Sequence, residues 1–126
     1  MNLEIVEFTV KHSVAAIPGA LTPSEVMAAL DAGADLIKIF PCAQVGGPSY
    51  IKALKAPFPH ARFIASGGVD QTTASDFIRA GAEVLGIRGK LMPPEAIEKR
   101  DQNWIGELAG RFLGIVQRAR AEYRMP

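Results

Sequence analysis

The sequence is poor in the residues that build disulfides and metal centres. It has one cysteine, Cys42, and two histidines, His12 and His60, among 126 residues. A single cysteine excludes an internal disulfide and a zinc site of several thiolates, and the two histidines lack the spacing of paired metal ligands. We interpret Cys42 as a packing or loop residue and the histidines as surface residues. We therefore expect chemistry that needs no metal and no other cofactor.

Long apolar runs and an excess of one charge are also lacking. Fourteen Lys and Arg face 13 Asp and Glu, giving a net charge of +1, and 48% of the residues are hydrophobic. No run approaches the roughly 20 apolar residues that cross a bilayer, and the amino terminus lacks the layout of a signal peptide. We expect a cytoplasmic protein with no nucleic-acid or membrane partner, folded as a single domain over residues 1–126.

Short apolar runs alternate with helical patterns along the chain. The runs end in Gly, Pro or Ser, which is typical of repeated β-α units. We predict strands over residues 14–17, 35–40, 62–65 and 83–87, and helices over 2–12, 23–32, 49–55, 71–80 and 103–123. Such right-handed units build either a small open sheet or an arc of a (β/α)8 barrel. A whole barrel takes roughly 200 residues or more, so this chain has only about half of the length that a barrel needs.

One lysine interrupts a predicted apolar strand. The run from Asp35 to Pro41 reads Asp-Leu-Ile-Lys-Ile-Phe-Pro and places Lys38 among four bulky apolar neighbours. Parallel strands of α/β proteins are covered on both faces, so we expect Lys38 to leave water. Desolvation disfavours the charged form of an amine, which makes Lys38 a candidate nucleophile for a carbonyl substrate. The alternative is a lysine that buries its stem and extends its amine to water.

Glycine-containing turns follow the next two predicted strands. Ser66-Gly67-Gly68 lies between a strand and a helix, and Gly86 and Gly89 lie at the end of the following strand. Ligands of α/β folds meet the carboxyl ends of the strands, where backbone amides hold anions such as phosphate. Each turn alone is explained by tight backbone geometry. Together they favour a phosphate site.

These motifs, at this spacing, resemble the 2-dehydro-3-deoxy-6-phosphogluconate and 4-hydroxy-2-oxoglutarate aldolases. The resemblance rests on Ile17-Pro18-Gly19, Thr22 through Glu25, Lys38-Ile39-Phe40-Pro41 and Ser66-Gly67-Gly68-Val69, and it covers almost the whole chain. It implies the second half of a (β/α)8 barrel, with four parallel strands alternating with helices. It also implies a class I aldolase that acts on a phosphorylated 2-oxo acid.

The resemblance assigns roles to particular residues. Lys38 would form a Schiff base with the C2 carbonyl of pyruvate or of the 2-oxo acid, and the iminium would act as the electron sink for carbon-carbon cleavage. Pro18 and Phe40 would line the pyruvate pocket. The substrate phosphate would be held by Ser66, Gly67, Gly68, Gly86 and Gly89.

The sequence departs from the family in two respects. Arg88-Gly89-Lys90 stands where the family usually has a Gly-Ser-like pair, which adds positive charge beside the predicted phosphate site. The family's other half-barrel, which supplies its glutamate acid/base and the groups that grip the pyruvate carboxylate, has no counterpart in this sequence. Unpartnered parallel strands expose two sheet edges, so we expect a homo-oligomer. Two alternatives to an aldolase stay open: a binding or assembly module without turnover, and a different lysine-dependent barrel such as an isomerase.

Overall fold

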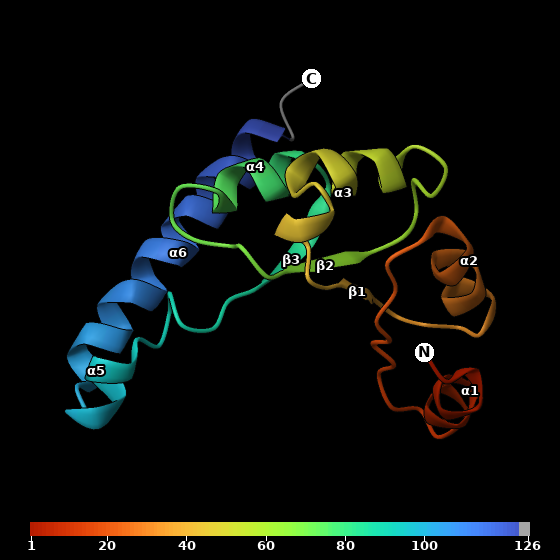
Figure 1. The fold of residues 1–126 in the computed structure, drawn as a ribbon, viewed down its shortest axis with the longest axis horizontal. Coiled ribbons are helices and arrows are strands. Elements are labelled where there is room, and N and C mark those ends of the chain that lie inside the picture. Colours follow the sequence, from red (N-terminus) through yellow and green to blue (C-terminus); the bar gives the residue numbers. More distant parts are fainter. Residues whose placement is uncertain (124–126) are drawn as a thin grey trace.

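The computed structural model describes residues 1–123, which form an arch of helices around a small parallel sheet (Figure 1). The strands are β1 (Ile37–Ile39), β2 (Phe63–Ser66) and β3 (Ala82–Gly86), hydrogen-bonded in the order β1-β2-β3. Both pairings are parallel, and Lys38 of β1 pairs with Ile64 of β2, which pairs with Val84 of β3. The sheet is therefore an arc of the kind that a (β/α)8 barrel contains.

Helices form the back and the two flanks of the arch. The helical elements are α1 (Leu3–Lys11), α2 (Pro23–Asp31), the 3-10 helix η1 (Ala43–Val45), α3 (Pro48–Lys55), α4 (Ala74–Arg79), α5 (Pro94–Glu98) and α6 (Gln102–Tyr123). Helices α3 and α4 lie over one face of the sheet, α1 and α2 form one flank, and α5 with α6 forms the other (Figure 1). Among residues 1–123 no helix is long and apolar enough to cross a membrane.

The structure has three strands where four were predicted, because the segment at 14–17 does not form a strand. This segment lies beside β1: Asp35 N–H donates to the Ala16 carbonyl at 3.0 Å, Lys38 N–H donates to the Pro18 carbonyl at 2.8 Å, and Gly19 forms an isolated parallel bridge with Lys38. Proline has no amide hydrogen, so Pro18 donates no bond to the ladder between these two contacts. The pairing is thus reduced to a bridge.

Helix α2 begins as the sequence predicts. The Thr22 hydroxyl accepts from Glu25 N–H at 3.3 Å, and Glu25 Oε2 accepts from the N–H groups of Leu21 and Thr22, both at 2.8 Å. This is a capping box with Pro23 in the first turn, and it supplies partners for amides that a helix start otherwise leaves unpaired. The bonds donated to Glu25 Oε2 by the N–H groups of Leu21 and Thr22, together with one from the Thr22 hydroxyl at 3.0 Å, hold the pKa of the Glu25 carboxyl below its ordinary value.

The sheet buries one face only, so the expectation that Lys38 leaves water is wrong. Ile37 and Ile39 are fully buried, whereas Lys38 between them is exposed. Helices cover the face that carries the two isoleucines, where the core gathers the largest buried side chains: Val26, Ile51, Leu54, Phe63 and Phe77. The opposite face, which we call the open face, carries the register row Lys38, Ile64 and Val84.

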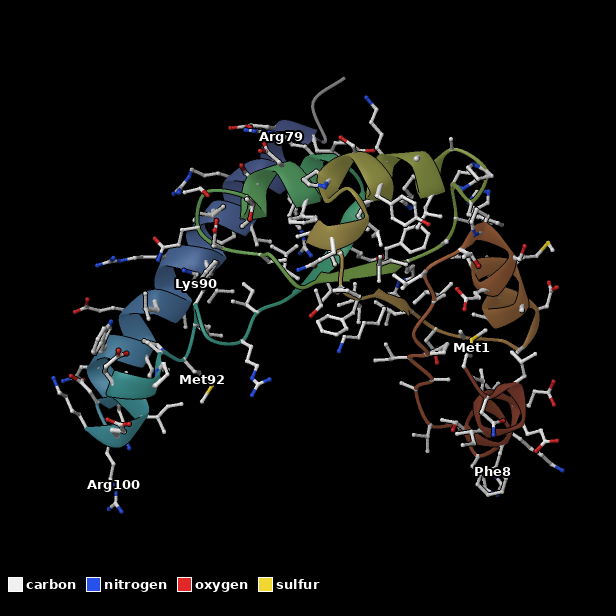
Figure 2. All side chains as sticks on the ribbon, in the orientation of Figure 1. Met1, Phe8, Arg79, Lys90, Met92 and Arg100 are labelled. Atoms are coloured by element: carbon white, nitrogen blue, oxygen red, sulfur yellow. The ribbon has the colours of Figure 1, made fainter. Side chains whose placement is uncertain are left out.

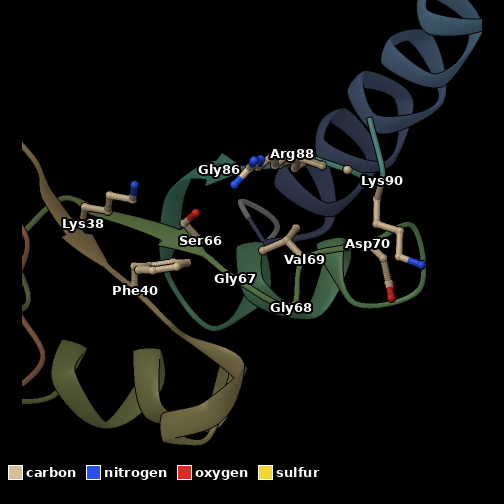
Figure 3. A pocket seen from close by; sticks show the side chains of 12 residues that line it. Lys38, Phe40, Ser66, Gly67, Gly68, Val69, Asp70, Gly86, Arg88 and Lys90 are labelled. Atoms are coloured by element: carbon tan, nitrogen blue, oxygen red, sulfur yellow. The ribbon is translucent and has the colours of Figure 1, made fainter. Parts of the chain in front are cut away.

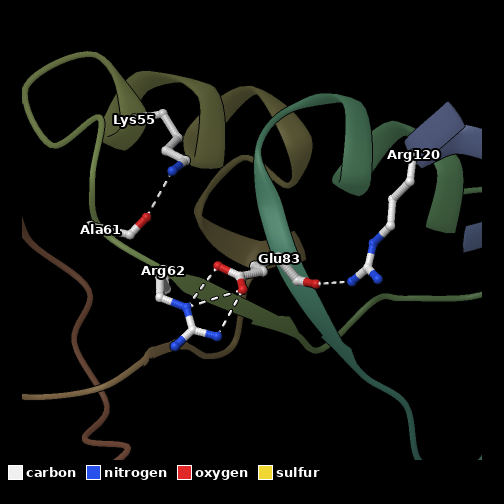
Figure 4. A network of polar contacts seen from close by, with 5 residues as sticks. All are labelled: Lys55, Ala61, Arg62, Glu83 and Arg120. Atoms are coloured by element: carbon white, nitrogen blue, oxygen red, sulfur yellow. Dashed lines mark hydrogen bonds and ion pairs between the residues drawn. The ribbon is translucent and has the colours of Figure 1, made fainter. Parts of the chain in front are cut away.

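The amino ends of β2 and β3 are tied by a polar network (Figure 4). Arg62 Nε donates to both Glu83 carboxylate oxygens, at 3.0 and 2.9 Å, and Arg120 of α6 donates to the Glu83 backbone carbonyl at 2.6 Å. Glu83 is the extra residue where the β2–β3 register shifts. Arg62 lowers the pKa of the Glu83 carboxyl. This end of the sheet is therefore built for stability, and the opposite end is left for a site.

Candidate active site

A cavity of about 780 Å³ opens at the carboxyl ends of the strands (Figure 3). It is lined by Lys38, Phe40, Ser66, Gly67, Gly68, Val69, Asp70, Gly86, Ile87, Arg88, Gly89 and Lys90. The structure thus brings together seven of the eight residues that the sequence assigned to a site. They arrive from all three strands and the loops that follow them.

Lys38 and Phe40 form one wall of the cavity. The Lys38 amine lies 5.3 Å from the centroid of the Phe40 ring, within the range of a cation-π contact. Phe40 is 56% exposed and Lys38 is exposed, so the two side chains present an amine and an aromatic face to any molecule in the cavity. A primary amine beside an apolar ring is suited to attack on a bound carbonyl.

The Ser66-Gly67-Gly68 turn forms the floor, and it requires its glycines. Gly67 and Gly68 have φ of +84° and +78°, a region that L side chains rarely adopt. The turn is held against the loop after β1, because Cys42 N–H donates to the Ser66 carbonyl at 2.8 Å and Ala43 N–H donates to the Gly67 carbonyl at 3.1 Å. Loops from two strands are thereby fixed around one cavity.

Gly86 and Gly89 lie on the third side. Gly86 pairs with Ser66 across β2 and β3, and a Cβ at position 86 would lie 2.8 Å from the Ser66 hydroxyl oxygen. Glycine at 86 therefore leaves room for that hydroxyl at the cavity. Gly89 also lines the cavity, but a Cβ there would meet nothing within 4 Å.

Asp70 is a lining residue that the sequence reasoning missed. Its Oδ1 accepts from the N–H and hydroxyl of Thr72, at 2.8 and 2.6 Å, and from Thr73 N–H at 3.0 Å. These bonds, the Thr72 hydroxyl first, hold the pKa of the Asp70 carboxyl below its ordinary value. The sequence Asp70-Gln-Thr-Thr before a helix is typical of an Asx turn and could have predicted these hydrogen bonds.

Two residues lie outside the cavity. Pro18 lines a separate pocket of about 320 Å³ beside α1, and its contact with the site is the hydrogen bond from Lys38 N–H to its carbonyl. Cys42 is fully buried and burial raises the pKa of its thiol to about 11, which agrees with a packing role. Within residues 1–123 no three His, Cys, Asp or Glu side chains are grouped as a metal site needs.

A parallel sheet with Lys38 and glycine turns at its carboxyl ends defines the class of the chain as part of an α/β barrel. Comparison with known proteins gives the family. Residues 1–108 match the family model described as KDPG and KHG aldolase, where KDPG is 2-dehydro-3-deoxy-6-phosphogluconate and KHG is 4-hydroxy-2-oxoglutarate. The chain belongs to this aldolase family, which confirms the resemblance seen in its sequence.

Curated relatives support the same assignment. The 2-dehydro-3-deoxy-phosphogluconate aldolase of Pseudomonas aeruginosa is 35% identical over 97 residues, which are 77% of this chain and 44% of that protein. The 2-dehydro-3-deoxy-6-phosphogalactonate aldolase of Escherichia coli is 38% identical over 92 residues, 72% of this chain and 44% of that protein. The chain therefore spans about half the length of the curated relatives it matches.

Solved structures show the same fold. A native KDPGal structure superposes with a TM-score of 0.79 and 30% identity over 93% of this chain and 57% of that one. The KDPG aldolase of Legionella pneumophila, with pyruvate captured as a covalent carbinolamine, gives a TM-score of 0.78 and 28% identity over 86% of this chain and 52% of that one. A partial barrel of three parallel strands is thus the architecture of residues 1–123.

Proposed function

We propose that this chain carries the Schiff-base half of a class I aldolase. The substrate is 2-dehydro-3-deoxy-6-phosphogluconate, cleaved to pyruvate and glyceraldehyde 3-phosphate, or 4-hydroxy-2-oxoglutarate, cleaved to pyruvate and glyoxylate. The observation that carries the proposal is the Lys38 amine at a cavity whose other walls are the glycine turns after β2 and β3. The names of the relatives support it, and we propose that residues 1–126 are a single domain that corresponds to the second half of such a barrel.

The reaction needs one nucleophile and one proton carrier. The neutral Lys38 amine adds to the substrate C2 carbonyl to give a carbinolamine, which loses water to an iminium. Removal of the C4 hydroxyl proton breaks the C3–C4 bond, the electron pair enters the iminium to give an enamine, and the aldehyde leaves. Protonation at C3 and hydrolysis then return pyruvate and the free amine. Lys38 supplies the nucleophile in this proposal, and the family resemblance assigns the proton carrier to the other half of the barrel.

The remaining site residues position the substrate in this proposal. Phe40 packs against the pyruvate methyl side, and Pro18 supports β1 through its carbonyl. The Ser66 hydroxyl, the amides of the glycine turn and the backbone at Gly86 and Gly89 hold the phosphate. No metal or other cofactor takes part, because the iminium itself accepts the electrons.

A second function is favoured by the open face. Lys38, exposed beside Ile64 on the uncovered face of the sheet, is not desolvated by this chain itself. In this alternative the chain is a half-barrel that binds phosphorylated 2-oxo acids and assembles with another half-barrel, such as a second copy in a homo-oligomer. The cytoplasm is its proposed location, and neither nucleic acid nor membrane is a proposed partner.

Trapping with borohydride separates the two functions. The chain is incubated with pyruvate and borohydride, which reduces a Schiff base to a stable amine, and the intact mass and modified peptide are read. We expect an adduct on the peptide that contains Lys38, its loss in Lys38→Met, and its retention in the matched control Lys52→Met on the exposed side of α3. No adduct in a chain that is folded by circular dichroism contradicts the aldolase half and leaves the assembly module.

A further inference from the structure

The residues that line the cavity carry a net positive charge. Lys38, Arg88 and Lys90 line it, and Asp70 is the only acidic residue among its lining residues. Asp70 already accepts hydrogen bonds from Thr72 and Thr73 at the start of α4. Within residues 1–123 neither Arg88 nor Lys90 forms an ion pair. Both cations are thus available to an anion in the cavity.

The two cations occupy different places. Figure 3 shows the Arg88 side chain extending from the loop after β3 past Gly86, with its guanidinium directed toward the Ser66 side of the cavity. Lys90 and Asp70 both lie farther out, at the end of the cavity away from Lys38. Arg88 is therefore placed to contact an anion that sits on the glycine turn, whereas Lys90 adds charge at the rim.

A guanidinium at this place changes what the site recognises. Backbone amides and a hydroxyl donate hydrogen bonds to any small anion, but the planar fork of arginine matches the paired oxygens of a phosphate. Lys38 lies on the opposite wall, where the carbonyl carbon must be. The ligand that satisfies both is elongated, with a 2-oxo group at one end and a dianionic group at the other.

We propose that Arg88 is a specificity-determining residue: its side chain selects ligands that end in a phosphate monoester over their unphosphorylated counterparts, and Lys90 increases the attraction at long range. This inference rests on the proposed function, because the carbonyl end of the ligand is assigned through Lys38. A site that depends on the Arg88 side chain differs from an anion site that is built by glycine backbone alone.

The test measures binding to the full chain, with glycerol 3-phosphate as the probe and glycerol as its uncharged match, by calorimetric or NMR titration. We expect Arg88→Gln to weaken binding of glycerol 3-phosphate by about 10- to 100-fold, the range of a lost charge-assisted contact. Arg88→Lys, which keeps the charge without the fork, should fall between Arg88→Gln and the original chain. Lys90→Gln should lose about 2- to 3-fold, and this loss should vanish in high salt.

Arg111→Gln is the matched control, because Arg111 is an exposed arginine on α6 and its loss changes the net charge equally. We expect it to bind within twofold of the original chain. An equal loss in Arg88→Gln and Arg111→Gln, or binding unchanged in Arg88→Gln, overturns the inference, as does an original chain that binds glycerol and glycerol 3-phosphate alike.

The borohydride experiment keeps this failure apart from failure of the aldolase proposal. A pyruvate adduct on Lys38 without selective phosphate binding refutes the role of Arg88 and leaves the Schiff-base chemistry standing. Selective binding that depends on Arg88, without any pyruvate adduct, supports the anion site and refutes the nucleophile.

Discussion

At the scale of single residues, Gly68 is fixed by two separate constraints. Its φ is +78°, and a Cβ at this position would lie 2.2 Å from the Cβ of Ala43. We expect Gly68→Ala to lower the free energy of unfolding by about 2 kcal/mol or more, since left-handed strain and overpacking each cost about 1–2 kcal/mol. Urea unfolding followed by circular dichroism measures it.

Gly89→Ala is the control for that experiment. Position 89 lies in the same cavity, but a Cβ there meets nothing within 4 Å. Its substitution should leave the free energy of unfolding within about 0.5 kcal/mol of the original chain. Equal losses at 68 and 89 would show that the contact with Ala43 does not restrict the turn.

Single residues also show which parts of the candidate site could be predicted from the sequence alone. Lys38 was found because a charged residue in an apolar run is conspicuous, and the family resemblance supported it. Its burial was mispredicted, because an apolar run does not reveal whether a second layer covers each face of a strand. Asp70 was missed, although the turn that it closes with Thr72 and Thr73 places it among the residues that line the cavity.

At the scale of elements, the capping box of α2 gives stability that depends on pH. Folding lowers the pKa of Glu25 below its ordinary value of 4.5, so the unfolded chain binds the proton more readily. The contribution of Glu25 is therefore complete above that value and is lost as the pH falls through the lower, folded one. Glu25→Gln should be less stable than the original chain at pH 7, and the difference should shrink toward zero below pH 4.5.

Thermal unfolding between pH 7 and pH 3 checks this expectation. Glu98→Gln, which changes an exposed glutamate of α5, is the control and should match the original chain at pH 7. A difference between Glu25→Gln and the original chain that stays constant across this range would mean that the carboxylate charge is not what the cap needs.

Helices with a clear local sequence pattern were predicted well, whereas elements whose bounds depend on contacts with other parts of the chain were not. The sequence Thr22-Pro-Ser-Glu25 is typical of the capping box that begins α2. The apolar pattern of α6 repeats over enough residues to predict a helix. Helix α4 is shorter than predicted, Ala74–Arg79 instead of 71–80, because the Asp70 turn occupies its first residues. The predicted strand at 14–17 does not form, because Pro18 has no N–H group to donate to β1. The sequence does not show which neighbouring strand that N–H group would have paired with.

At the scale of the whole molecule, the arch leaves an apolar surface without a partner. Val84 is 39% exposed on the open face, in the same register row as Lys38 and Ile64. Further large apolar side chains are exposed on the two flanks, among them Phe8 of α1 and Met92 before α5 (Figure 2). Exposed apolar area of this extent, next to the edge strand β3, favours association.

We therefore expect the chain to self-associate through the open face and Val84→Lys to weaken the association at least about tenfold, because an unpaired ammonium would be buried at the contact. The substitution should leave the fold intact, since Val84 is already partly exposed. Sedimentation velocity over a range of concentrations measures the assembly. Leu113→Lys is the matched control: Leu113 is 62% exposed but lies on α6, away from the sheet. The expectation is contradicted if the original chain stays monomeric at every concentration. It is also contradicted if Val84→Lys and Leu113→Lys weaken the association equally.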